Sequence, residues 1–343
     1  MNDKLFKLSE DGTVLIKFVG GDDITEVTIP EGVTKIGDRA FQDYTSLISV
    51  NIPKSVKEIG DVPFRDCWSL SSINVNTNNS NFASIDGVLF NKEKTILIKY
   101  PIGKLQTSYT IPEGVTEIGS WAFVFCHSLE SINIPESVTV IGEGAFDGCR
   151  SLTQINIHEG VTVIGEGAFD CCESLTQINI PEGVTKIGDY AFDECRSLEF
   201  INIPNSVKKI GNGAFDSCVS LESIYIPEGV TEIGMCAFAY CESLESISIP
   251  NSVKKIGERA FACCASLESI SIPNNVTEID PETFDGCVSL EYIDIPESVT
   301  EIGVRAFQDC SSLTSINISK SMPKIGEAAF DGCESLTSIN IWK

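Results

Sequence analysis

A phenylalanine recurs at a constant step of 23 residues along most of this chain. A fixed period of this length is typical of repeat architectures, because each repeat buries its apolar face only against its neighbours. The 343 residues are therefore expected to form one stacked array, although the length alone would allow two globular domains. The repeated positions are Phe41, Phe64, Phe123, Phe146, Phe169, Phe192, Phe215, Phe238, Phe261, Phe284, Phe307 and Phe330.

Each repeat follows one template, which residues 129–149 show well as LESINIPESVTVIGEGAFDGC. In its first half, Leu129, Ile132 and Ile134 have the spacing of a short strand whose apolar side chains point inward. Pro135 follows and ends this strand, since proline has no N–H to donate to a strand ladder. The template therefore predicts one short strand at the start of every turn.

The second half of the template holds two further apolar groups. Val138 and Ile141 predict a short second strand on another side of the turn. Ala145, Phe146 and Cys149 have the spacing of one helical turn and are expected to close the coil. Together these pieces predict an α/β repeat solenoid of 23-residue turns, with short second strands and one-turn helices.

The first strands are expected to form one continuous parallel sheet. They begin near Ile24, Leu47, Leu70 and Gln106, and then every 23 residues from Leu129 to Leu336. This spacing predicts about fourteen strands, which would extend over about 60 Å at ~4.8 Å per strand.

Two segments depart from the template. Residues 1–23 contain Asp11-Gly12 between apolar runs, which predicts a hairpin-like cap before a solenoid over residues 24–343. The step from Leu70 to Gln106 is longer than 23 residues, so residues 76–108 hold an insertion. Within it, two apolar runs flank residues 91–94 and predict a β-hairpin.

The net charge of −25 limits the choice of partners. An acidic chain repels phosphate backbones and anionic lipid, so neither nucleic acid nor a membrane surface is expected as a partner. No run of 18 apolar residues is present, which argues against membrane insertion. The N-terminus lacks the apolar core of a secretory signal, so the chain is either cytoplasmic or begins after a removed leader.

Eleven of the fourteen cysteines follow the repeated Phe by three residues. Identical residues of neighbouring turns point in parallel directions, which keeps their Cβ atoms too far apart for a disulfide. These cysteines are therefore expected to be small, buried and reduced. No C-x2-C pair, phosphate loop or dinucleotide motif is present, and His127 and His158 lack sequence partners. No catalytic residue, metal site or cofactor is expected.

Two sets of residues stand out on the expected strand surface. Five glutamates occupy one position in successive turns, where like charges oppose one another and are destabilising. Three aromatic residues interrupt a surface that is otherwise small and polar. These candidate partner-binding residues are Glu199, Glu222, Glu245, Glu268, Glu291, Phe200, Tyr225 and Tyr292. The competing explanation is recent duplication of one Glu-bearing repeat, together with ordinary scatter of exposed aromatics.

The template L-x-x-I-x-I-P-x-x-V-x-x-I-G-x-x-A-F-x-x-C resembles the BspA-like leucine-rich repeats, which are found in surface proteins of host-associated bacteria and in parasitic protists. The resemblance covers the chain from about Ile24 to Ile341, and the segment SIDGVLFNKEKTILIKYP is similar to an insertion common in that family. It implies a right-handed leucine-rich-repeat coil, location at the cell surface or secretion, and adhesion to host or matrix proteins.

Two functions stay open at this point. The first is a non-enzymatic protein-binding scaffold, a surface or secreted adhesion protein of a host-associated microbe whose partner is a host or matrix protein. The alternative is a cation- or glycan-binding solenoid that uses its acidic and aromatic strand face. Neither the identity of the partner nor the oligomeric state follows from the sequence.

Overall fold

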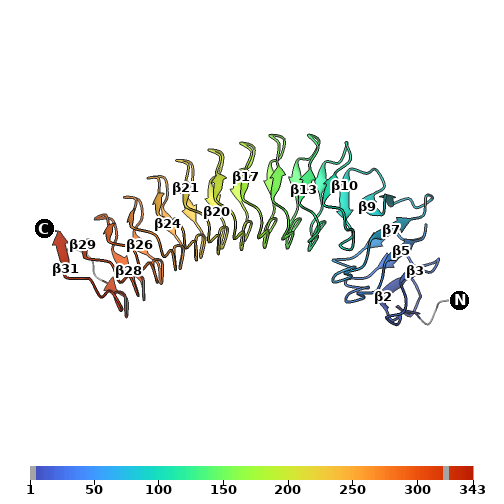
Figure 1. Ribbon diagram of the computed structural model, residues 1–343, viewed down its shortest axis with the longest axis horizontal. Coiled ribbons are helices and arrows are strands. Elements are labelled where there is room, and N and C mark those ends of the chain that lie inside the picture. Colours follow the sequence, from blue (N-terminus) through green and yellow to red (C-terminus); the bar gives the residue numbers. More distant parts are fainter. Residues whose placement is uncertain (1–4, 320–323, 343) are drawn as a thin grey trace.

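The computed structural model describes residues 5–319 and 324–342 of the chain. The chain winds into a curved stack of similar turns (Figure 1). The N-terminal turns, drawn in blue, are tilted against the long arc that the rest of the chain forms. The repeat therefore builds an elongated solenoid with one marked bend.

The first strands of the turns form two parallel sheets. Three of them pair in the N-terminal part, namely β3 (Glu26–Thr28), β5 (Ser49–Ile52) and β7 (Ser72–Val75). Eleven pair in the long arc, namely β11 (Ser108–Thr110), β13 (Ser131–Asn133), β15 (Gln154–Asn156), β17 (Gln177–Asn179), β19 (Phe200–Asn202), β21 (Ser223–Tyr225), β23 (Ser246–Ser248), β25 (Ser269–Ser271), β27 (Tyr292–Asp294), β29 (Ser315–Ser319) and β31 (Ser338–Trp342). The expected number of about fourteen strands is confirmed, whereas the expected single continuous sheet is wrong.

The break between the two sheets has its cause in the insertion. β8 (Phe82–Ile85), β9 (Val88–Asn91) and β10 (Ile96–Lys99) form an antiparallel meander. The backbone N–H of Ile73 in β7 donates to the carbonyl of Gly87 in this meander at 2.8 Å. Because β7 is occupied by the meander in this way, it does not pair with β11, and the second sheet starts anew.

The second strands lie on another side of the turns, and the first two of their sheets contain an antiparallel hairpin. β1 (Phe6–Leu8) pairs antiparallel with β2 (Val14–Phe18), which continues in parallel with β4 (Lys35–Ile36) and β6 (Glu58–Ile59). Within the insertion, β9 and β10 repeat this arrangement, and β10 pairs in parallel with the next second strand. The remaining second strands are β12 (Glu117–Ile118), β14 (Val140–Ile141), β16 (Val163–Ile164), β18 (Lys186–Ile187), β20 (Lys209–Ile210), β22 (Glu232–Ile233), β24 (Lys255–Ile256), β26 (Glu278–Ile279), β28 (Glu301–Ile302) and β30 (Lys324–Ile325).

The one-turn helices expected around the repeated Phe are wrong, because these segments are successive tight turns and the described residues contain no helix. Two residues of each such segment adopt left-handed backbone conformations, as Gly144 does at φ 54° and Gly148 at φ 66°. The N–H groups of both glycines donate to carbonyls of the following turn at 2.8 Å. A helix needs consecutive residues in the right-handed backbone conformation and hydrogen bonds within the segment. These segments meet neither condition.

The core consists of two stacks of buried aromatic rings. The longer stack starts at Tyr100 and continues from Phe123 to Phe330, with ring centroids 5.2–5.6 Å apart. The shorter stack starts at Phe18 and continues through Phe41 and Phe64. Phe18 ends the second strand of the first hairpin, and Tyr100 directly follows the second strand of the other, so each stack starts at a hairpin. The buried apolar residues divide into two clusters at the same place.

The cysteine column satisfies backbone groups of this core. The thiol of Cys149 donates to the carbonyl of Phe123 in the preceding turn at an Sγ–O distance of 3.2 Å, and the same contact recurs along the column. All fourteen cysteines are free, and the column from Cys67 to Cys310 is buried. Cysteine therefore acts here as a small apolar residue that also donates a weak hydrogen bond.

Replacing one ring in the middle of the stack should be costly. Phe192 is fully buried between Phe169 and Phe215, with both centroid distances at 5.5 Å. We expect Phe192→Ala to lower the free energy of unfolding by about 3–5 kcal/mol, because the cavity cannot collapse between rigid neighbours. Urea denaturation followed by circular dichroism measures this. Phe200→Ala, at an exposed position, is the control and should cost much less; a cost below about 1 kcal/mol at Phe192 would contradict the packing.

The thiols should react only after unfolding. Labelling with a maleimide in the absence of reductant is expected to be slow in native protein and to reach nearly all fourteen cysteines in denaturant. Mass spectrometry counts the labels. Five or more cysteines that stay unlabelled after unfolding without reductant would show native disulfides and contradict the parallel geometry of the column.

Candidate functional site

The three candidate aromatics project from the first-strand face of the long arc. Their exposed fractions are 58% for Phe200, 60% for Tyr225 and 44% for Tyr292. Asn202 of β19 lies opposite Tyr225 of β21, so Phe200 and Tyr225 occupy diagonal positions on neighbouring strands. Tyr292 opens β27, which is three strands further along the sheet from Tyr225. The structure thus places the first two aromatics close together and the third apart from them.

The five glutamates are exposed and form one file along the edge of these strands. Their backbones are bonded from turn to turn, as shown by the Glu245 N–H to Glu222 carbonyl distance of 3.1 Å and the Glu291 N–H to Glu268 carbonyl distance of 3.0 Å. Among the described residues, no lysine, arginine or histidine pairs with any of the five. The file therefore carries uncompensated negative charge.

On the second-strand side of the solenoid, some neighbouring strands carry opposite charges that form ion pairs. There Lys209 and Glu232 face each other on β20 and β22, with an Nζ–Oε1 distance of 2.9 Å. Glu301 and Lys324 form another such pair on β28 and β30. Opposite charges across neighbouring strands stabilise the stack modestly. Like charges also face each other on that side, as Lys186 and Lys209 do and as Glu278 and Glu301 do. The five glutamates of the first-strand face have no opposite charge among the described residues, so ion pairing between turns does not explain them.

A shallow groove lies on the first-strand face before the aromatics. It has a volume of about 590 Å³, runs across β11 to β19, and ends at Phe200. Its outward side chains are amides and hydroxyls, and none of the residues that line it is charged. We call it the amide groove, after Asn133, Asn156, Asn179, Gln154 and Gln177. The sequence shows these residues as ordinary polar strand positions, and only the structure joins them into one hollow.

A column of half-buried aspartates lies in the tight turns that follow the repeated Phe. Burial, together with the neighbouring Asp170, raises the pKa of Asp147 to about 7. The same two causes, with added repulsion from Asp216, raise the pKa of Asp193 to about 7. Burial also raises the pKa of Asp170 and of Asp216. The column is a second file of like charges, but one that is partly shielded from water.

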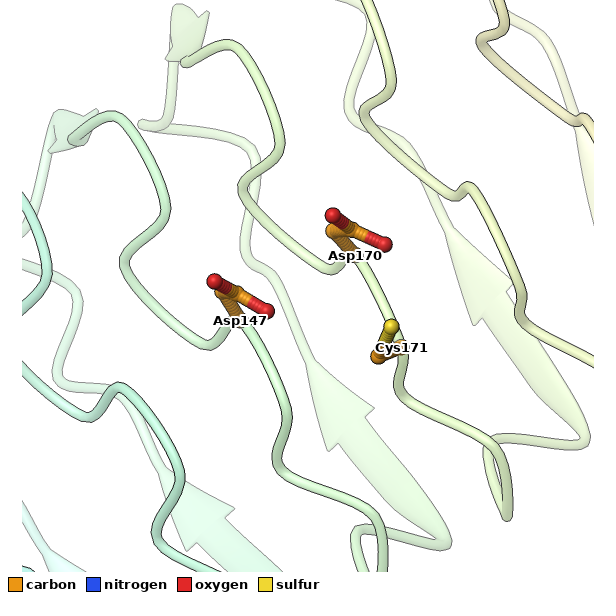
Figure 2. A group of neighbouring side chains, drawn as sticks. All are labelled: Asp147, Asp170 and Cys171. Carbon is orange, nitrogen blue, oxygen red and sulfur yellow. The ribbon is translucent and has the colours of Figure 1, made fainter. Parts of the chain in front are cut away.

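Within this column, Asp147, Asp170 and the thiol of Cys171 lie together (Figure 2). One oxygen or sulfur atom of each lies within 4.8 Å of the others, which is the kind of grouping that can hold a metal ion. Burial raises the pKa of the Cys171 thiol and of both carboxyls. Metal ligands must be deprotonated, so these raised pKa values make protons compete with a metal ion for the site. This cluster was not predicted from the sequence. The available signal was an Asp directly after the repeated Phe in four successive turns.

The cysteine and histidine residues do not form a nucleophilic pair. Burial raises the pKa of Cys126 to about 12, which keeps it protonated. Its neighbour His127 stacks on Trp68 with ring centroids 5.8 Å apart, and burial lowers its pKa. These residues pack across the bend between the two sheets, and nothing in the described residues shows a catalytic arrangement.

The aspartate column predicts an unusual dependence of stability on pH. A carboxyl whose folded pKa is raised stabilises the fold most at low pH, and this contribution is lost between the ordinary pKa of 3.8 and the folded pKa of about 7. Asp147→Asn with Asp193→Asn removes this loss, so the stability of the double variant relative to wild type should increase by at least about 1 kcal/mol from pH 5 to pH 8. Thermal unfolding at both pH values measures this difference. Asp331→Asn, at an exposed position of the same column, is the control; an equal effect at pH 5 and pH 8 for the double variant would contradict the shifted pKa values.

Solved structures of bacterial proteins show the same architecture. A leucine-rich repeat protein from Eubacterium ventriosum is 28% identical with a TM-score of 0.61, over 70% of this chain and 77% of that chain. A leucine rich cell surface protein from Faecalibacterium prausnitzii is 31% identical with a TM-score of 0.55, over 98% of this chain and 93% of that chain. A comparison with curated proteins gives no significant match.

The described residues include no helix with the length and apolar character needed to cross a membrane. The family described as BspA type leucine rich repeat region (6 copies) matches residues 17–103, 103–222 and 208–337. Together these matches span almost the whole solenoid. The chain therefore belongs to the BspA-type leucine-rich repeat family.

Proposed function

We propose that this chain is a non-enzymatic scaffold that binds a protein with a basic surface through its first-strand face. The binding strip consists of Phe200, Tyr225 and Tyr292 together with the file of five glutamates. The observation that supports it is the exposure of large aromatic rings beside carboxylates that no described cation neutralises. Solvent-exposed like charges in register weaken a sheet, so their presence on one face is more readily explained by a partner than by stability.

The two components of the strip would contribute differently. Binding energy in protein interfaces concentrates in a few aromatic anchors, whereas surrounding charge mainly sets the association rate and the choice of partner. Phe200 and Tyr225 are neighbours and would form the central anchor. Tyr292 lies further along the glutamate file and would extend the contact in the direction of the solenoid axis.

The proposed setting is the surface of a host-associated microbe. The Faecalibacterium prausnitzii relative, which is similar over 98% of this chain, is described as a cell surface protein. Adhesion to a host or matrix protein fits an elongated scaffold that offers one long face. A location at the surface, or secretion, is accordingly part of this proposal.

A cation ligand is a weaker alternative for the glutamates. Calcium takes six to eight oxygen ligands that converge on one point. The five glutamates instead stand one per turn in a file, each on a different strand. A calcium titration followed by thermal unfolding tests this alternative, because a ligand that prefers the native state raises the melting temperature.

The aromatic pair should dominate affinity for the partner. We expect Phe200→Ala with Tyr225→Ala to weaken binding by at least about 2 kcal/mol, since both rings are exposed in the free chain and would be buried in the complex. The partner is first recovered by affinity capture from host extracellular proteins, and the purified pair is then measured by surface plasmon resonance.

Changing the five glutamates to Gln should instead lower the association rate, with a larger effect at low salt. Asp147→Asn with Asp193→Asn, in the turns after the repeated Phe, is the matched control and should leave binding unchanged. If the aspartate variant abolishes binding while the aromatic variant binds normally, the partner uses a different face.

A further inference from the structure

The amide groove carries no charge, although the chain as a whole is strongly acidic. The whole chain has a net charge of −25, yet every residue that lines the groove is neutral. The residue just before each of these strands is Glu130, Thr153, Thr176 or Glu199. Acidic side chains therefore flank the two central strands of the groove but do not lie beside them. A ligand that fits here is therefore uncharged along its length.

The amides in the groove have unused hydrogen-bonding capacity. Asn133, Gln154, Asn156, Gln177 and Asn179 are all exposed, and none of their side chains has a hydrogen-bond partner among the described residues. By contrast, Asn74 at the same repeat position of the N-terminal sheet donates to Asn51 at 3.2 Å. A free carboxamide offers two donor hydrogens and an acceptor oxygen, which matches a hydroxyl group, because a hydroxyl both donates and accepts.

The amides recur in register with the strands. Ser131, Gln154 and Gln177 form one file, and Asn133, Asn156 and Asn179 form a second file two residues further along each strand. Neighbouring strands lie about 4.7–4.9 Å apart. The groove therefore offers a polar side chain at both positions on β13, β15 and β17, and the full Gln/Asn pair on β15 and β17.

Phe200 closes the groove at its C-terminal end. Its ring is 58% exposed and begins β19, in the same file as Gln154 and Gln177. An exposed aromatic face next to hydroxyl-binding amides is suited to the apolar C–H face of a sugar ring. Amides along a groove and an aromatic ring at its end together supply the two kinds of contact that a sugar needs.

We propose that the amide groove binds an extended, uncharged oligosaccharide that lies across β13 to β19, parallel to the solenoid axis. One pyranose unit spans roughly the distance between neighbouring strands, so successive sugars would meet the polar pairs of β13, β15 and β17 and then the ring of Phe200. An extended peptide rises only about 3.2–3.4 Å per residue and would fall out of register with the strands. The groove is separate from the glutamate file, and it shares only Phe200 with the proposed protein-binding strip.

The test uses the full chain and defined neutral oligosaccharides. Hexamers of the cellulose, chitin and mannan types are titrated by isothermal calorimetry at 50 mM and 500 mM salt, after a survey on an array of neutral glycans. We expect at least one neutral glycan to bind, with an affinity that salt does not change. Asn156→Ala with Gln177→Ala should weaken that binding at least tenfold, and Asn156→Asp should also weaken it.

Two controls separate this site from its surroundings. Ser271→Ala changes the same strand position beyond the groove, and Glu222→Gln with Glu245→Gln removes charge from the glutamate file; both variants should bind the glycan as wild type does. Melting temperatures establish that every variant is folded. Tyr225→Ala should reduce binding of the protein partner but not of the glycan, so failure of either proposal can be recognised by itself.

Three results would overturn the glycan proposal. One is the absence of binding by any neutral glycan at millimolar concentration. Another is binding that persists unchanged in the folded Asn156→Ala, Gln177→Ala variant. The third is binding of extended peptides or acidic glycans in preference to neutral ones, with the same dependence on the amides.

Discussion

The structure depends on hydrogen bonds that run from each turn to the next around a central stack of aromatic rings. Phe192 shows this arrangement: its N–H donates to the carbonyl of Ala214 at 2.9 Å, and its own carbonyl accepts from the Cys218 thiol at 3.2 Å. Because polar backbone groups near the core are satisfied between turns, successive turns of the regular array keep the same length. The 23-residue period follows from this requirement, and the rings keep the turns in register.

A strict period has a consequence for the surface, since each position in the repeat becomes a file along the solenoid. Like residues then stand about one strand spacing apart, whatever their chemistry. The glutamate file is exposed to water, whereas the aspartate column is half-buried, and burial raises the pKa of Asp147 and Asp193 to about 7. The neutral file of amides forms a third type of surface. The strict period thus produces a charged strip, a column of half-buried aspartates and an uncharged groove.

The insertion decides where these surfaces can lie. It repeats the arrangement of the N-terminal hairpin and starts a second ring stack at Tyr100. The insertion takes up a backbone hydrogen bond of β7, which ends the first sheet. β11 is therefore the first strand of the long sheet, and the amide groove starts there. The groove and the aromatic pair therefore lie on one uninterrupted sheet, on the same side of the bend.

The sequence by itself determined the solenoid, the repeat length, the number of first strands and the buried Phe and Cys columns, because core packing requires the same apolar residue at the same place in every turn. It also pointed to Phe200, Tyr225 and the glutamates as surface features. Only the tertiary structure decided that the turns after Phe are not helical and that the sheet is broken at β7. Both outcomes depend on hydrogen bonds between residues in different turns and on left-handed conformations at non-glycine residues such as Tyr190 and Glu194, which local spacing does not reveal. The amide groove and the raised aspartate pKa values likewise arise from neighbours that are 23 residues apart in the chain and adjacent in space.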